Sequence, residues 1–255
     1  MFFTCKSKLV NAEVEALHRS QAVIFFSPDG TILDANENFL NAMGYTLAEI
    51  KGKHHRLFVD ADYANSADYA LFWDKLTQGT FISDEFHRHG KDGKDVWIQA
   101  SYNPLISSNG NVLQIVKYAT DITAQKQTDA DYKGQIAAIG KSQAVIEFST
   151  DGTILNANEN FLNTTGYTLE EIKGKHHCIF VSEKERNSTT YLQFWKDLAL
   201  GNHRAGEYKR IAKDGSEIWI NASYNPILDV NGNPCKVYCW LWVGSSTYVC
   251  KKMDR

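Results

Sequence analysis

The sequence predicts an α+β protein that consists of two similar domains, each a five-stranded antiparallel sheet with helices packed on one face, joined by a helical linker. Residues 20–59 recur as residues 142–181, with 32 of 40 positions identical at a constant offset of 122. Each copy runs from two strand-like segments through helical segments to three further strand-like segments. The turn signals Asp92-Gly93 and Asn109-Gly110 separate those last three, as expected of tight β-hairpins.

The first copy is expected to open with a hairpin. Residues 22–27 form a short apolar run that ends in the turn sequence Pro-Asp-Gly at 28–30. Such a turn favours a return strand, which we place at residues 31–33.

Short helical segments follow. Residues 36–43 carry apolar side chains on one face, and Gly44 can end this helix. Thr46 and Glu49 form a capping-box pair at the start of a further turn over residues 47–51.

A longer helix and three strands complete the copy. The helix is expected over residues 62–78, because apolar side chains recur there at positions i, i+3, i+4 and i+7. The strands are expected at residues 81–89, 95–106 and 112–121. The resulting organisation is an N-terminal helix at 1–19, domains at 20–124 and 142–245, a helical linker at 125–141 and a tail at 246–255.

Composition and charge exclude several classes of protein. The net charge of −3 gives no overall attraction to nucleic acid. The longest strongly apolar run, residues 237–243, is too short for a membrane span, and the N-terminus lacks the apolar stretch of a signal peptide. Five cysteines without a C-x-x-C pair argue against a disulfide framework. We therefore expect a cytoplasmic protein.

The segments before each copy carry matching apolar stripes with spacings of four and three residues, which lie on one face of a helix. The stripes are Val10, Val14 and Leu17 before the first copy, and Tyr132, Ile136 and Ile139 before the second. Two alternatives remain open. Each helix packs on its own domain, or it pairs with the same helix of a second subunit and forms a homodimer.

These motifs together resemble the PAS sensor-domain family. The matching stretches are D-G-T-I-L-D-A-N-E-N-F-L, G-Y-T-L-A-E-I-K-G-K and the closing hairpins D-G-K-D-V-W-I-Q-A-S-Y-N-P-L and N-G-N-V-L-Q-I-V-K-Y-A-T-D-I-T. The D-I-T exit, Asp121, Ile122 and Thr123, implies a junction that transfers a signal from the last strand to a helix. The second copy departs from this pattern, with Val243, Gly244 and Ser245 at those positions.

The tandem arrangement, with G-K-H-H and Y-x-x-F-W in each copy, is similar to the sensory region of bacterial chemoreceptors of the aerotaxis and biofilm-dispersal types. The resemblance implies a sensor of a small ligand, redox state or oxygen that signals to a chemotaxis or other signalling partner. The alternative is a ligand-free PAS module for protein–protein interaction or dimerisation.

The resemblance also implies a ligand between the sheet and the helices, with flavin (FAD), haem or no cofactor as open possibilities. An indole can stack on a flavin, a histidine can ligate haem iron, and an asparagine can bond a ring edge or cap a helix. Core packing is the alternative for the aromatic side chains, and a capping or surface position is the alternative for the histidines. The candidates are Asn36, His54, His55, Phe58 and Trp73 in the first copy, and Asn158, His176, His177, Phe180 and Trp195 in the second.

Metal binding, catalysis and cysteinyl-flavin photochemistry are not expected. His87 and His89 form an H-x-H pair on a strand, which we interpret as an exposed edge, and the pair Cys235 and Cys239 as strand packing. His55 stands where light-sensing flavin domains carry their reactive cysteine. We recognise no catalytic motif and predict that the protein is not an enzyme.

Overall fold

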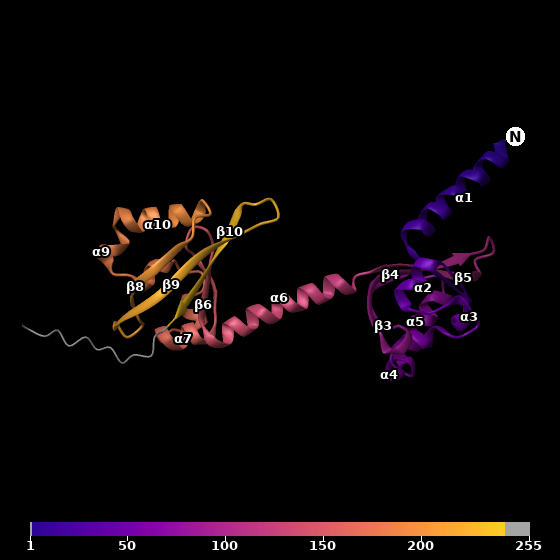
Figure 1. Ribbon diagram of the computed structural model, residues 1–255, viewed down its shortest axis with the longest axis horizontal. Helices are drawn as coiled ribbons and strands as arrows, with labels where there is room; N and C mark the ends of the chain where they lie inside the picture. Colours follow the sequence, from indigo (N-terminus) through magenta and orange to yellow (C-terminus); the bar gives the residue numbers. More distant parts are fainter. Residues whose placement is uncertain (1, 243–255) are drawn as a thin grey trace, which may run out of the picture. The chain divides into compact units, whose positions relative to one another are not determined.

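The computed structural model describes residues 2–242, and the chain divides after Asp131 into two compact units of the same architecture (Figure 1). We call the unit through Asp131 domain 1 and the unit from Tyr132 domain 2. Each holds a five-stranded antiparallel sheet together with helices, so the predicted α+β class is confirmed.

Domain 1 follows the predicted order of elements. Its elements are α1 (Phe2–Ser20), β1 (Ala22–Phe26), β2 (Ile32–Ala35), α2 (Glu37–Met43), α3 (Leu47–Ile50), the 3₁₀ helix η1 (His55–Phe58), α4 (Ala61–Ala64), α5 (Ala67–Thr77), β3 (Ile82–His89), η2 (Lys91–Gly93), β4 (Asp95–Ile106) and β5 (Val112–Asp121). The strand order in the sheet is β2-β1-β5-β4-β3. The first hairpin therefore lies beside the last strand, with β1 paired to β5.

Domain 2 repeats this order after a long helix. Its elements are α6 (Thr123–Ser142, which begins in domain 1), β6 (Ala144–Phe148), β7 (Ile154–Ala157), α7 (Glu159–Thr165), α8 (Leu169–Ile172), η3 (His177–Phe180), α9 (Glu183–Arg186), α10 (Thr189–Ala199), β8 (Arg204–Ile211), β9 (Glu217–Leu228) and β10 (Pro234–Trp242). The strand order is β7-β6-β10-β9-β8, and β6 pairs with β10 as β1 pairs with β5.

Strand alternation places the core of each domain between the sheet and the helices. On β4, Val96, Ile98, Ala100 and Tyr102 are all buried, while the residues between them are more exposed. Such alternation follows from the pleat of a strand. The same positions of β9 are Ile218, Ile220, Ala222 and Tyr224, of which all but Ile218 are buried.

One helix differs from the prediction. The single helix expected over residues 62–78 consists of two helices, α4 and α5. Ser66 separates them, because its extended backbone and its hydroxyl, which accepts a hydrogen bond from the N–H of Tyr69, make it the N-cap of α5. The apolar spacing that predicted the helix is correct for α5 alone.

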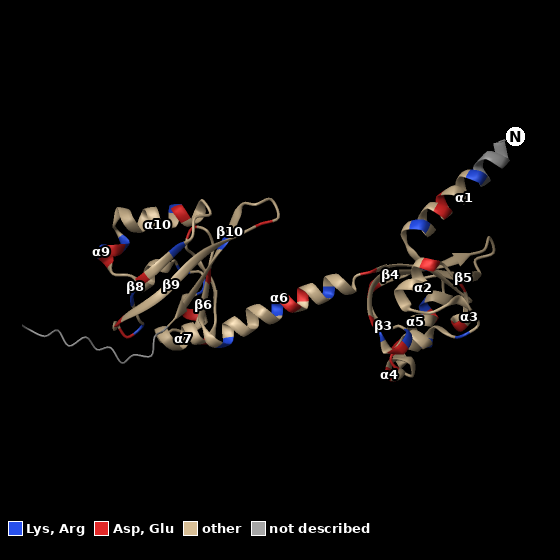
Figure 2. Cartoon of the chain, in the orientation of Figure 1, with Lys and Arg blue, Asp and Glu red and all other residues tan. Residues whose placement is uncertain are grey.

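Charges of both signs are interspersed along α1 and α6 (Figure 2). Among the described residues, no helix combines the length and the apolar composition needed to cross a bilayer.

The turn between β6 and β7 leads to a stability prediction. A Cβ at Gly152, where φ is +90°, would lie 2.6 Å from Nε2 of His176 and 2.8 Å from the ring of Trp195. We therefore expect Gly152→Ala to destabilise domain 2 by about 2 kcal/mol through overpacking and backbone strain. Hydrogen exchange of domain 2 core amides measures the loss.

Gly174→Ala is the matched control. Gly174 also has a positive φ, +79°, but a Cβ added there would have no atom within 4 Å. This variant is expected to show backbone strain alone, about 1 kcal/mol. Equal losses for the two variants would contradict the role assigned to the His176 and Trp195 contacts.

Candidate functional site

A buried histidine lies at the centre of domain 1. His55, the first residue of η1, is fully buried, and both of its ring nitrogens are hydrogen-bonded. Nδ1 is 2.9 Å from the hydroxyl of Tyr69 on α5, and Nε2 is 3.0 Å from the hydroxyl of Tyr102 on β4. The histidine thus connects the helical layer to the sheet.

Two buried cations accompany this histidine. Arg88 on β3 is 4% exposed and donates to the Tyr102 hydroxyl at 3.3 Å and to the carbonyl of His87 at 2.8 Å. Lys117 on β5 is 1% exposed, and its Nζ lies 4.8 Å from the centre of the Tyr102 ring. Tyr102 therefore contacts three polar side chains inside the core.

Burial and charge shift the pKa values of these groups. Burial, together with the charges of Arg88 and Lys117, holds the pKa of His55 well below its ordinary value. Burial also lowers the pKa of Lys117 to about 8. For Tyr102, burial acts to raise the pKa, but Arg88 and Lys117 outweigh it and the net pKa is lowered. His55 is consequently neutral at pH 7.

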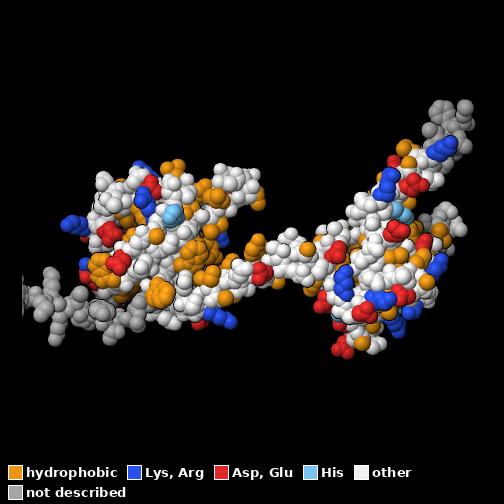
Figure 3. All heavy atoms as spheres, viewed as in Figure 1, with side chains coloured by type: hydrophobic (Ala, Val, Ile, Leu, Met, Phe, Trp, Pro, Cys, Tyr) orange, Lys and Arg blue, Asp and Glu red, His pale blue; other side chains and the backbone are white. Residues whose placement is uncertain are grey.

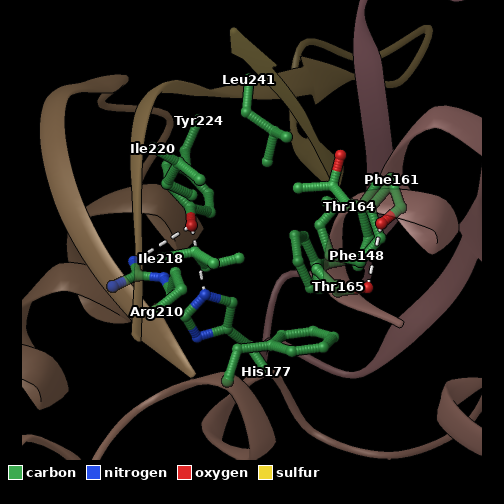
Figure 4. Close-up of a pocket in the computed structure, with 12 residues that line it drawn as sticks. Phe148, Phe161, Thr164, Thr165, His177, Arg210, Ile218, Ile220, Tyr224 and Leu241 are labelled. Carbon is green, nitrogen blue, oxygen red and sulfur yellow. Dashed lines mark hydrogen bonds between the residues drawn. The ribbon is translucent and has the colours of Figure 1, made fainter. Parts of the chain in front are cut away.

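Domain 2 contains the same network with one substitution, and Figure 4 shows the part formed by His177, Arg210 and Tyr224. His177 hydrogen bonds with the hydroxyls of Tyr191 at 2.8 Å and Tyr224 at 3.2 Å, and Arg210 donates to Tyr224 at 3.1 Å. Cys239 occupies the position of Lys117, and burial raises the pKa of its thiol to about 12. Domain 2 therefore holds one cation fewer in its core.

A small cavity adjoins the network of domain 2. Its volume is about 10 Å³, and its lining includes Phe148, Thr164, Thr165, His177 and Tyr224. Figure 4 shows these side chains around the space, with the Thr165 hydroxyl directed to the Phe161 carbonyl, which it reaches at 2.9 Å. In domain 1, Ala42 and Met43 stand where Thr164 and Thr165 do.

This cavity does not fit either candidate cofactor. Small-molecule sites typically enclose about 300–1,000 Å³, whereas about 10 Å³ accommodates a single water. Both nitrogens of His177 are also engaged by tyrosine hydroxyls, so neither is free for iron. Neither a flavin ring nor a haem fits with the side chains in this arrangement.

The predicted asparagines cap helices. Asn36 accepts a hydrogen bond from the N–H of Phe39 at the start of α2, and it also accepts from the N–H of Val23. Its side-chain amide donates to the carbonyls of His18 and Gln21, at the end of α1. Asn158 makes the equivalent bonds in domain 2, to Phe161, Val145, Gly140 and Gln143.

The first histidine of each pair also has a local role. Nδ1 of His54 accepts from the N–H of Arg56, while Nε2 donates to the carbonyl of Asp29 at 2.8 Å. His176 is bonded in the same way to Cys178 and Asp151. The two histidines of each pair therefore have different positions. The first is hydrogen-bonded to the backbone of a turn, and the second is buried in the core.

The predicted aromatic residues lie in the two cores. Phe58, Trp73, Phe180 and Trp195 are all buried. Trp73 meets Phe26 edge-on, with ring centres 5.7 Å apart, and His55 at 5.4 Å. The structure thus brings His55, Phe58 and Trp73 together.

Four members of the network in domain 1 were not among the predicted site residues: Tyr69, Arg88, Tyr102 and Lys117. Strand alternation could have found two of them. Tyr102 shares a face with Ile98 and Ala100 on β4. A charged residue at an inward position, such as Arg88, is the corresponding signal on β3.

The predicted signal-transfer residues join the sheet to α6. The N–H of Trp97 on β4 donates to the Thr123 hydroxyl at 2.9 Å, and the N–H of Ile122 donates to the Trp97 carbonyl at 2.8 Å. The N–H of Thr123 in turn donates to the Asp121 carboxylate at 2.8 Å. The first turn of α6 is therefore hydrogen-bonded to β4. The corresponding Val243, Gly244 and Ser245 lie outside the described residues.

A salt bridge adds a second connection. Nζ of Lys126, one turn into α6, lies 2.5 Å from the carboxylate of Glu85 on β3 and 5.3 Å from the centre of the Trp97 ring.

Comparisons with known proteins agree with this architecture. Two models described as PAS fold match the chain, one at residues 18–127 and the other at residues 154–241. Together they span most of both domains.

Three curated proteins are similar in sequence. Biofilm dispersion protein BdlA of Pseudomonas aeruginosa is 40% identical over 222 residues, which are 87% of this chain and 53% of BdlA. The oxygen sensor protein DosP of Escherichia coli is 25% identical over 58% of this chain and 18% of its own length. The aerotaxis receptor of Escherichia coli is 29% identical over 29% of this chain and 15% of its own length. The chain thus spans about half the length of BdlA. With a PAS model matched in each half and the corresponding sheet in each domain, the chain belongs to the PAS family as a tandem of two PAS domains.

Proposed function

We propose that this chain is a non-enzymatic, cytoplasmic sensory module that responds to a small ligand, redox state or oxygen. A change at the buried His–Tyr–Arg network passes through the sheet to α6 and reaches a signalling partner in chemotaxis or biofilm regulation. Its similarity to a biofilm dispersion protein, an aerotaxis receptor and an oxygen sensor supports this role.

The observation that carries the proposal is the position of two residues on one strand. Tyr102 on β4 contacts His55, Arg88 and Lys117, and Trp97 on the same strand bonds the start of α6. A shift of β4 that accompanies a change at Tyr102 therefore acts on the hydrogen bonds of Thr123. Coupling of this kind requires different ligand affinity in the two states, typically about 1–3 kcal/mol.

We propose a second input site in domain 2, beside its equivalent of this network. Its cavity is lined by apolar side chains together with five polar residues, Thr164, Thr165, His177, Arg210 and Tyr224. A space of about 10 Å³ suits a very small ligand or a water molecule. In domain 1 the larger side chains of Met43 and Lys117 stand at the positions of Thr165 and Cys239.

The test begins with natively purified protein. An absorption spectrum detects a bound flavin or haem, and mass spectrometry of an extract detects other ligands. Hydrogen exchange of residues 123–128 is then compared between air-saturated and dithionite-reduced protein, and between ligand-loaded and stripped protein. We expect exchange at the start of α6 to change with the input. An invariant α6 in a protein without any bound ligand would refute the sensing role.

Thr123→Ala tests the junction between β4 and α6 independently of ligand binding. Loss of its hydroxyl removes the acceptor for Trp97 N–H, so exchange of residues 123–128 should accelerate about 5- to 30-fold, as a loss of about 1–2 kcal/mol implies. The input-dependent change should disappear. Thr128→Ala, which removes only a hydroxyl bonded to the Ala124 carbonyl in the same helix, is the control and should retain that change.

A second candidate function, dimerisation, is favoured by exposed apolar side chains. On α1, Leu9, Val10, Val14 and Leu17 are between 41% and 61% exposed, and on α6 Tyr132, Ile136 and Ile139 are between 39% and 60% exposed. Figure 3 shows hydrophobic side chains on the surface of both helices. We propose a homodimer through these stripes. Light scattering should show a dimer that Val14→Glu or Ile136→Glu dissociates and Glu15→Gln does not; a monomeric parent chain would exclude it.

A further inference from the structure

Three potential metal ligands meet at the edge of the sheet in domain 1. One ring nitrogen of His87, one of His89 and one carboxylate oxygen of Asp60 all lie within 4.8 Å of one another. The two histidines are about one-third exposed and Asp60 is largely exposed, so an ion from solvent can reach them. This cluster lies outside the buried network.

The fold explains why these residues converge. On β3, Arg88 points into the core, so His87 and His89 both lie on the opposite face. β3 is an edge strand, and Asp60 stands directly before α4. Its carboxylate lies 2.7 Å from Nε2 of His89. Asp60, from the helical layer, thus lies beside the two histidines of the sheet.

Asp95 on β4 provides an orienting carboxylate. It pairs with His89 in the strand register, and its Oδ1 lies 2.9 Å from Nε2 of His87 and 3.5 Å from Nδ1 of His89. Carboxylates that hydrogen bond to metal-ligating histidines fix the ring orientation and tautomer. The cluster therefore offers two imidazoles, one carboxylate ligand and a second carboxylate beside them.

We propose that domain 1 binds one divalent transition-metal ion, of the Zn²⁺ class, through His87, His89 and Asp60, with Asp95 as an orienting residue or fourth ligand. Imidazole and carboxylate donors suit these ions. With Zn–N distances of about 2.0–2.1 Å, the donors of a tetrahedral site lie about 3.3 Å apart. The ligand atoms of His87, His89 and Asp60 already lie within 4.8 Å of one another.

The second copy lacks this donor set. Its corresponding residues are Ser182, Lys209, Ile211 and Glu217. Lys209 instead forms an ion pair with Glu217 at 2.5 Å. The site is therefore a property of domain 1 alone, although the two sequences are otherwise so similar. The sequence pattern indicated only an exposed edge at His87 and His89, since the second copy has Lys209 and Ile211 there, and it did not include Asp60, which is distant in sequence.

The ion would join the helical layer to the strand that carries Arg88, whose side chain reaches Tyr102. The metal site does not depend on the sensing role, since metal binding is measured directly.

The test uses the full chain with Co²⁺ and Zn²⁺ as probes. Calorimetry should show one equivalent of Zn²⁺ per chain, and Co²⁺ should give ligand-field absorption bands that Zn²⁺ abolishes. His87→Ala and Asp60→Asn should each weaken binding at least about 10-fold. His203→Ala, a histidine of domain 2 outside the cluster, should leave it unchanged. Absence of binding at micromolar Zn²⁺, or full affinity in the His87→Ala variant, would overturn the proposal.

A second variant, in which the donor residues are introduced into domain 2, tests the proposal even if a loss variant misfolds. We call this variant the graft. The triple replacement Ser182→Asp, Lys209→His and Ile211→His reproduces the donor set beside Glu217. We expect the stoichiometry to rise from one to two equivalents. A folded graft that still binds one equivalent would count against the proposed ligand set.

Discussion

Lys117→Met is expected to stabilise domain 1 by about 3 kcal/mol at pH 7. Burial lowers the pKa of Lys117 from 10.5 to about 8, and each pKa unit corresponds to about 1.4 kcal/mol. The folded domain therefore holds a charged ammonium at a free-energy disadvantage relative to the unfolded chain. Methionine retains the shape of the stem without the charge. Hydrogen exchange of slowly exchanging amides in β4 and β5 measures the gain.

The pH dependence of the gain in stability shows whether the buried charge of Lys117 causes it. Below pH 8 the lysine is charged in both states and the disadvantage is complete. Between pH 8 and 10.5 the folded state has released the proton that the unfolded state still binds, so the stability of the parent chain rises with pH. The advantage of Lys117→Met should thus decline over this range and vanish above pH 10.5. A gain that persists there would point to packing.

Domain 2 provides the reciprocal experiment. Cys239→Lys introduces the same charge beside Arg210, among equivalent side chains, and should destabilise domain 2 by about 3 kcal/mol at pH 7. Domain 1 is the internal reference in this variant, and its stability should not change.

Acidification from pH 7 to pH 5 is expected to destabilise both domains through their buried histidines. Burial holds the pKa of His55 and of His177 well below 6.5, with Arg88, Lys117 and His54 adding to the effect at His55 and Arg210 and His176 at His177. Below pH 6.5 the unfolded state binds a proton that the folded state does not. Each histidine therefore reduces stability by about 1.4 kcal/mol per pH unit until its folded-state pKa is reached.

His177→Gln tests this assignment within one molecule. Glutamine can still hydrogen bond to tyrosine hydroxyls but does not titrate. In this variant, domain 2 is expected to be less stable at pH 7 than in the parent chain. As the pH falls, it should lose less stability than domain 1 of the same molecule. Hydrogen exchange of β4 and β9 amides gives the free energy of opening of each domain. Its change between pH 7 and pH 5 is compared for the two domains. Parallel slopes in both domains would assign the acid sensitivity to other groups.

The fold could be predicted from the sequence because local signals agree with one another. Strand alternation, the Asp-Gly and Asn-Gly turns and the capping pair Thr46 and Glu49 all act over a few residues, and the repeat shows each of them twice. The break before α5 was not predicted, because the apolar spacing lies entirely after Ser66 and does not indicate where the helix begins.

The site could be predicted only in part. The G-K-H-H motif pointed to His55 and His177, but not to which of two adjacent histidines enters the core. Their partners lie far away in sequence, as with Tyr102, which is 47 positions from His55. Such contacts depend on sheet order and register, which the sequence pattern did not determine. The same holds for Asp60 and His89, which only the folded edge of the sheet brings together.

The pairing of β1 with β5, and of β6 with β10, has a consequence for folding. Two nearly identical hairpins on one chain can each dock against the wrong last strand, which is a known hazard of repeated domains. The difference between Phe25 and Glu147 opposes this exchange. Glu147 accepts from the Tyr238 hydroxyl at 2.6 Å and lies 3.4 Å from Lys236, whereas β5 offers Val116 opposite Phe25. The difference at this position, matched by Val116 against Tyr238 on the last strands, thus favours pairing of each hairpin with its own partner strand.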